Sequence, residues 1–132
     1  MDPRRVRRVA AGAVAASLLS LAFAAAAERQ GVVRMLIQSS PLAGFKYYEA
    51  DQVWQQLQVG DVLELVREPD NAHDPRAVRV SWRGRILGYV PRRENGALAW
   101  AMDRGETLRA QISRLSAHPN PAKRIEFEVY IE

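Results

Sequence analysis

Apolar and polar residues alternate along much of the chain after residue 31, which is the pattern of strands with one buried face. The stretch IEFEVYIE (125–132) alternates most regularly, and Ile125 and Phe127 are predicted to face the core. In the first alternating stretch, Met35 and Ile37 are predicted to share a face. The pattern predicts six strands in all, at 32–38, 59–68, 77–82, 85–90, 106–116 and 125–132.

Two other stretches, 49–57 and 92–105, carry apolar residues at helical spacing. In the second, Leu98 and Met102 lie four residues apart, and Gly105 stands where a helix commonly ends in a left-handed residue. Many short strands with Gly and Pro turns indicate a mainly β fold. We therefore predict a small OB-like barrel of about six strands with two short helices, because closure protects strand edges as apolar as the last one.

The first 27 residues have the order of a secretory signal peptide. The basic stretch MDPRRVRR is followed by an apolar, Ala-rich run from 9 to 27 that ends in small residues. The sequence thus predicts a signal peptide at 1–27, a domain at 28–132, and export to the periplasm or the medium. An uncleaved membrane anchor is the alternative for 1–27, and a misassigned start would make the protein cytoplasmic.

The net charge of the predicted domain is different once residues 1–27 are left out. The whole chain has 19 Lys and Arg against 15 Asp and Glu. Removing the four Arg and one Asp of residues 1–27 leaves 15 basic and 14 acidic residues, a net charge of +1. A polyanion partner therefore has to be argued from local clusters. The chain has no Cys, which excludes disulfides and thiolate zinc sites.

The loop within VREPDNAHDPRAVRV (66–80) gathers most of the candidate chemistry. Asp70 and Asn71 have the side chains of Asx turns, so the loop has a purely structural interpretation. The same residues also carry a resemblance. LVREPDNAHDPRAVRV, followed by GRILGYVPRRENGALAWAMDRG and preceded by GFKYYEA, resembles the HIRAN domain over Val33 to Ile131.

This resemblance implies a modified OB-like barrel with two helices that recognises single-stranded DNA and its 3′ end. Bacterial members occur alone or beside nucleases and helicases, so a stand-alone bacterial module is expected. The positions that match the family's DNA-binding residues are Lys46, Tyr47, His73, Asp74, Tyr89 and Arg92. The DNA-end-binding members have a phenol where this chain has His73, an imidazole where it has Tyr89, and Arg where it has Lys46.

The chemistry of these side chains agrees with nucleic-acid binding. Tyrosine and histidine rings stack on unpaired bases, and Lys and Arg contact phosphates. Asp74 would repel a phosphate but can accept a hydrogen bond from a terminal sugar hydroxyl, unless it only forms the turn. With the neighbouring Tyr48 and Arg93, the predicted nucleic-acid-binding residues are Lys46, Tyr47, Tyr48, His73, Asp74, Tyr89, Arg92 and Arg93.

Catalysis is not expected from this sequence. There is no Cys nucleophile, no G-x-S-x-G element and no Gly-rich phosphate loop, and no cofactor is expected. Two alternatives remain. One is an exported binding module that recognises a non-nucleic-acid ligand or a protein partner; the other is a metal-dependent hydrolase or nuclease that uses Glu68, Asp70 and Asp74. A membrane would be a partner only if the first segment stays attached.

Overall fold

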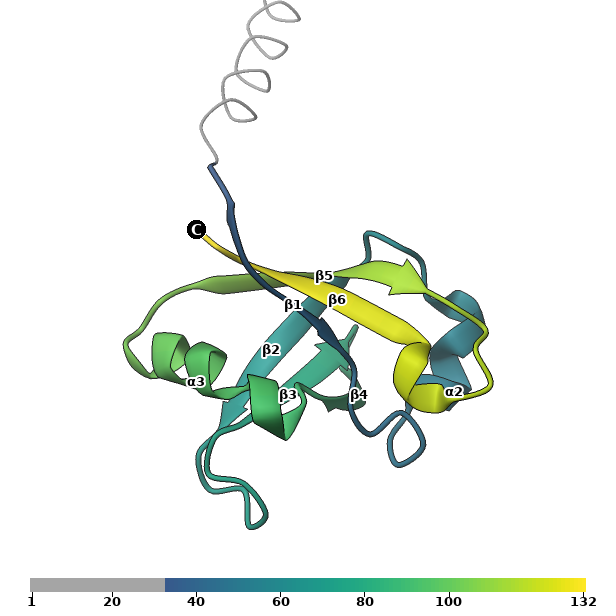
Figure 1. Cartoon of the computed structure of the whole chain (residues 1–132), viewed down its shortest axis with the longest axis horizontal. Coiled ribbons are helices and arrows are strands. Elements are labelled where there is room, and N and C mark those ends of the chain that lie inside the picture. The colour runs from purple at the N-terminus through teal and green to yellow at the C-terminus, as the bar shows by residue number, and fades with distance from the viewer. Residues whose placement is uncertain (1–32) are drawn as a thin grey trace, which may run out of the picture. The chain divides into compact units, whose positions relative to one another are not determined.

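Six antiparallel strands form one sheet in residues 33–132, the part of the chain that the computed structural model describes (Figure 1). The strands are β1 (Met35–Pro41), β2 (Val62–Glu68), β3 (Ala77–Trp82), β4 (Arg85–Tyr89), β5 (Leu108–Leu115) and β6 (Ile125–Ile131). Their order across the sheet is β1-β6-β5-β2-β3-β4. The mainly β prediction with six strands is thereby confirmed, and the predicted segment 1–27 lies outside the described residues.

Both predicted helices are present, each joined to a short 3₁₀ turn. The helical elements are α2 (Ala50–Val53), η1 (Trp54–Gln56), η2 (Arg92–Glu94), α3 (Gly96–Asp103) and η3 (Pro121–Lys123). The two α-helices lie at opposite ends of the sheet (Figure 1). Helix α3 ends as predicted, since Gly105 has φ +84° and its N–H donates to the carbonyl of Met102. The N–H of Glu106 donates to the carbonyl of Ala101, which completes a Schellman motif. None of the helices within 33–132 combines the length and apolar character needed to cross a bilayer.

The predicted alternation places the core correctly in β6, whereas β3 is buried at five of its six positions. Val78 and Val80 of β3 and Phe127 of β6 are fully buried. Ile112 of β5 and Leu98 of α3 are fully buried too, so the sheet and the longer helix share one core.

Strand β1 departs from its prediction. It begins three residues later, and Met35 and Ile37 are 63% and 40% exposed. The buried residue is Ser40 instead. The cause is local: β1 is an edge strand that pairs only with β6 in the described sheet, and its register shifts between Leu36 and Gln38. A bulge of this kind breaks the alternation that a sequence pattern assumes.

The two ends of the strand order approach each other just after β1. Ala43 and Tyr89 form an isolated antiparallel bridge, with both N–H···O distances at 2.9 Å. Gly88 makes this approach feasible, because a Cβ there would lie 2.2 Å from the carbonyl oxygen of Ala43. No ladder joins β1 to β4 within residues 33–132, so this bridge is the backbone link between the two edges.

Candidate functional site

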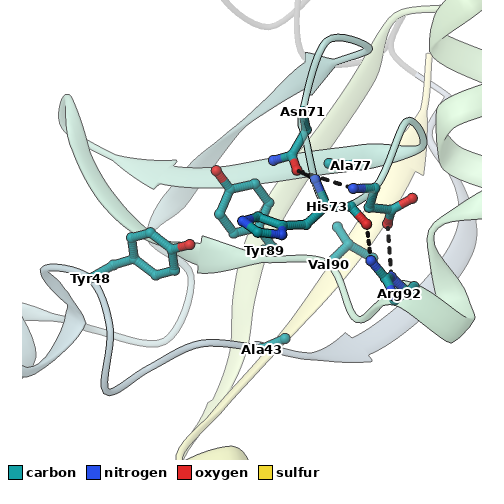
Figure 2. Close-up of a pocket in the computed structure, with 9 residues that line it drawn as sticks. Ala43, Tyr48, Asn71, His73, Ala77, Tyr89, Val90 and Arg92 are labelled. Carbon is teal, nitrogen blue, oxygen red and sulfur yellow. Dashed lines mark hydrogen bonds and ion pairs between the residues drawn. The ribbon is translucent and has the colours of Figure 1, made fainter.

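A pocket of about 220 Å³ lies beside this bridge, between the β2–β3 loop and the end of β4 (Figure 2). Five of the predicted binding residues line it: Tyr48, His73, Asp74, Tyr89 and Arg92. The remaining lining residues are Ala43, Asn71, Ala77 and Val90. Residues from three separate stretches of sequence are thus brought to one place. Figure 1 shows the β2–β3 loop extending beyond the ends of its two strands.

Asn71 organises the loop. Its side-chain oxygen accepts hydrogen bonds from the backbone N–H of His73, at 2.9 Å, and of Asp74, at 3.2 Å. Its amide nitrogen donates to Glu68 Oε1 at 3.0 Å. The guanidinium of Arg92 donates to the carbonyl of His73 from the other side (Figure 2). The predicted Asx turn is therefore present at Asn71, and it holds His73 and Asp74 at the pocket.

Asp74 both forms the turn and lines the pocket. Its Oδ1 accepts a hydrogen bond from the N–H of Arg76 at 3.0 Å, and its Oδ2 accepts one from Asn95 Nδ2 at 2.7 Å. The Nε atom of Arg92 lies 3.8 Å from the same Oδ2. The hydrogen bond from Arg76, assisted by Asn95 and Arg92, lowers the pKa of Asp74 against the effect of burial. Asp74 is an ionised acceptor, and its carboxylate keeps lone pairs for one more donor.

Tyr89 forms an aromatic wall of the pocket. Its hydroxyl donates to Glu68 Oε1 at 2.8 Å, and Glu68 Oε2 lies 2.9 Å from Arg79 Nη1. The rings of Tyr48 and Tyr89 lie 5.3 Å apart between centroids, with their planes at 59°. Burial, followed by the hydrogen bond to Glu68, raises the pKa of Tyr89 to about 12. The phenol is neutral at physiological pH. Its hydroxyl is held by Glu68, and its ring lies against Tyr48.

The other predicted residues lie outside this pocket. Tyr47 is 83% exposed, whereas Tyr48 contacts Tyr89, so the two neighbouring tyrosines divide between solvent and pocket. Lys46 lines a different hollow, of about 320 Å³, together with Arg124. Arg93 lines hollows that adjoin the pocket. Lys46 and Arg92 therefore line different hollows.

Sequence reasoning passed over two residues that matter to the site. Asn95 is completely buried, and its amide reaches Asp74 rather than capping α3. Its place just before an Ala-rich helix is the sequence cue, because Asn is common at helix N-caps. Arg76 supplies the N–H that Asp74 accepts, and its side chain is exposed beside Arg92 and Arg93. Its sequence cue is that Arg76 lies in LVREPDNAHDPRAVRV, while Arg92 and Arg93 lie in the second stretch that carries the resemblance.

The alternative of a metal-dependent hydrolase or nuclease requires a group of metal-binding side chains. Within residues 33–132, no three His, Cys, Asp or Glu side chains are grouped so that they would hold a metal ion.

Comparison with known proteins relates most of the described chain to one family. The model of the HIRAN domain matches residues 36–132. A solved structure of a Lactobacillus plantarum protein is similar with a TM-score of 0.66 and 24% identity, covering 75% of this chain and 95% of that one. The HIRAN domain of human HLTF is similar with a TM-score of 0.57 and 22% identity, covering 74% of this chain and 78% of that one.

Among curated proteins, a Fanconi-associated nuclease 1 homolog from Oryza sativa subsp. japonica is 42% identical over 53 residues. The match covers 37% of this chain and 6% of that protein, so the chain spans a small part of its relative's length.

Proposed function

The chain belongs to the HIRAN domain family, and we propose that it is a nucleic-acid-binding module that takes the 3′ end of a DNA single strand into the pocket beside the β2–β3 loop. The observation that carries the proposal is the placement of Asp74. An ionised carboxylate, a guanidinium, two phenol rings and an imidazole line one pocket of about 220 Å³. A strand end offers the matching groups: a hydroxyl, a phosphate and a base.

The aromatic side chains account for binding an unpaired base. Tyr48, Tyr89 and His73 each present a ring at the pocket, and stacking on one ring contributes ~1–3 kcal/mol per base. Stacking is tolerant of sequence because every base has a π-face. We therefore expect little preference among bases.

Asp74 and Arg92 account for selecting an end. The carboxylate can accept a hydrogen bond from a free 3′-hydroxyl but would repel a 3′-phosphate at the same position. We propose that Arg92, whose Nε lies 3.8 Å from Asp74, contacts the phosphate that precedes the terminal sugar. A continuous strand lacks the hydroxyl and would leave Asp74 facing a phosphodiester.

Two further parts of this proposal concern the chain outside the pocket. We propose that Lys46, Tyr47 and Arg93 contact the strand beyond its end, and that the sheet is a partly open OB-like barrel, an interpretation supported by the Ala43–Tyr89 bridge. We also propose that residues 1–27 are a cleaved signal peptide, so that the domain at 28–132 meets its ligand outside the cytoplasm. N-terminal sequencing of the protein from cells tests this, and an intact Met1 in a cytoplasmic fraction would overturn it.

The test of the main proposal is fluorescence anisotropy with a 5′-labelled oligothymidylate at low salt. We expect tight binding of the free 3′-hydroxyl form and at least tenfold weaker binding of the 3′-phosphate form. Asp74→Asn should remove most of this difference. Asp70→Asn is the matched control, because it makes the same charge change in the same loop at an exposed side chain that does not line the pocket.

Two results would contradict the proposal. Absence of binding to any oligonucleotide at low salt would remove the nucleic-acid function and leave a non-nucleic-acid ligand or a protein partner. Equal binding of the two 3′ forms by the unaltered protein would keep the function but remove the role of Asp74 in choosing an end.

A further inference from the structure

Three exposed arginines line two hollows that adjoin the pocket. The first hollow, of about 550 Å³, is lined by Arg76, Arg92 and Arg93 with Pro41, Leu42, Ala43, Pro91 and Ala122. The second, of about 370 Å³, is lined by the same arginines with Gln38, Glu94, Gly96 and Ala97. Ala43 and Arg92 line both the 220 Å³ pocket and the first hollow. The three spaces are therefore adjacent, and we call the two hollows together the arginine groove.

The positive charge of this groove is largely uncompensated within residues 33–132. Arg92 is paired with Asp74, and the charge of Arg76 also helps to lower the pKa of Asp74, but neither Arg76 nor Arg93 forms an ion pair or a side-chain hydrogen bond within the described residues. Glu94 is the one acid that lines the groove, and its Oε2 is buried. Like charges that line one groove repel one another, and a polyanion bound there would offset the repulsion.

The groove is built from two elements that the fold brings together. Arg76 lies at the end of the β2–β3 loop, and Arg92 and Arg93 lie in η2. The Arg76 side chain reaches across to α3, since its Nη1 is 3.5 Å from where a Cβ would stand on Gly96. The arginines thus converge from both sides, while prolines and small apolar side chains form much of the remaining wall.

This combination fits a polynucleotide better than a small anion. Arginine forks bind phosphate oxygens in pairs, and the apolar wall offers a surface to sugars and base edges. The groove also starts where the pocket ends, at Ala43 and Arg92. A strand whose end occupies the pocket would pass directly over it.

We propose that the arginine groove is a second subsite, which binds the phosphates of the nucleotides preceding the terminal one through Arg76 and Arg93. This inference rests on the proposed function. It assigns phosphate binding to the groove as a whole and adds Arg76 to the residues that contact the strand. Its consequence is that affinity rises with oligonucleotide length.

The test is competition binding with an unlabelled thymidine dinucleotide and octanucleotide, both with free 3′-hydroxyls. We compare the unaltered protein with Arg76→Gln, Arg93→Gln and the control Arg114→Gln, which removes an exposed arginine of β5 that lines none of the three spaces. For the octanucleotide, Arg76→Gln and Arg93→Gln should each weaken binding about threefold or more. Each should also reduce the slope of log K against log salt by ~0.7. Dinucleotide binding should change little.

Arg76→Lys distinguishes a loss of affinity caused by removing the charge from one caused by damage to the loop. It keeps the charge, so the salt slope should be retained even where affinity falls. If no oligonucleotide binds, the proposed function fails. If the octanucleotide binds but Arg76→Gln and Arg93→Gln behave like Arg114→Gln, the groove is not a subsite and the proposed function stands.

Discussion

The hydroxyl of Tyr89 donates a 2.8 Å hydrogen bond to the carboxylate of Glu68, across the two strands that flank β3. Glu68 is held in turn by Asn71 and Arg79, so the ring of Tyr89 is tied to the loop that carries Asp74. One carboxylate therefore couples the aromatic wall of the pocket to its turn. Removing this hydrogen bond should therefore loosen both the Tyr89 ring and the loop that carries Asp74.

Tyr89→Phe separates the ring from its hydrogen bond. We expect the free energy of unfolding to fall by about 1–2 kcal/mol, because a partly buried bond to a charged group is lost while the ring still packs on Tyr48. Oligonucleotide affinity should change less than in Tyr89→Ala, which also loses stacking worth ~1–3 kcal/mol. Urea unfolding and anisotropy measure the two effects.

Tyr130→Phe is the control for that experiment. It removes another phenol-to-carboxylate hydrogen bond, to Glu128, on β6 and outside the pocket. Oligonucleotide affinity should be unchanged in this variant. Equal losses of affinity in Tyr89→Ala and Tyr130→Phe would argue against a role for the Tyr89 ring in binding.

The close approach of Gly88 to Ala43 predicts intolerance of any side chain at this position. A Cβ on Gly88 would lie 2.2 Å from a backbone oxygen, so the bridge between the two sheet edges must open. We expect Gly88→Ala to reduce the free energy of unfolding by more than about 2 kcal/mol, as a steric clash in a packed region does. Chemical denaturation followed by circular dichroism provides the measurement.

Gly96→Ala is the matched substitution. Its Cβ would meet Arg76 Nη1 at 3.5 Å, an ordinary contact, within helix α3. Because Ala favours a helix over Gly by about 0.5–1 kcal/mol, stability should be retained or raised. If Gly88→Ala is as stable as Gly96→Ala, the bridge does not depend on the glycine.

The pKa shifts predict a loss of stability in acid. Burial is the largest single influence and raises the pKa of Glu68, but the hydrogen bonds from Asn71 and Tyr89 and the charge of Arg79 together outweigh it and lower the pKa below its ordinary 4.5. A carboxylate whose folded pKa is lowered stabilises the fold above its unfolded pKa, and this contribution is lost as pH falls through the folded value.

The pH window of this loss is therefore below about 4.5. Glu68→Gln should be less stable than the unaltered protein at neutral pH, and the difference should shrink as the pH is lowered through that window. Urea unfolding at a series of pH values measures it. A difference that stays constant across the window would mean that ionised Glu68 does not stabilise the fold.

The sequence predicted the buried residues of a strand correctly where buried and exposed positions alternate without interruption. Strand β6 has the predicted inward residues Ile125 and Phe127, whereas β3 is buried at five of its six positions and shows no alternation. The prediction failed at β1, where an edge position and a bulge leave Met35 exposed. Local propensity cannot report these features, since both depend on the pairing partner.

The candidate site could be predicted only where its residues are close together in the sequence. His73 and Asp74 are adjacent in a turn with recognisable chemistry, so their joint placement follows from the sequence. The contributions of Asn95 and Arg76 depend on how η2 and α3 pack against the loop, a contact between segments about 20 residues apart in the sequence. Such contacts are fixed by the fold and have no local pattern.

The tyrosine pair tests whether the structure or the family pattern identifies the ring that binds. The resemblance points to Tyr47, but the turn at Gly44, with φ +84°, leaves Tyr47 83% exposed and brings Tyr48 against Tyr89 at the pocket. We expect Tyr48→Ala to weaken oligonucleotide binding by ~1–3 kcal/mol, because it removes a pocket ring. Tyr47→Ala should weaken it less, since an exposed ring outside the pocket is not held against a base. Anisotropy on both variants, with circular dichroism to confirm folding, measures the difference. A larger loss in Tyr47→Ala would show that the strand lies over the outer face of this turn and not in the pocket.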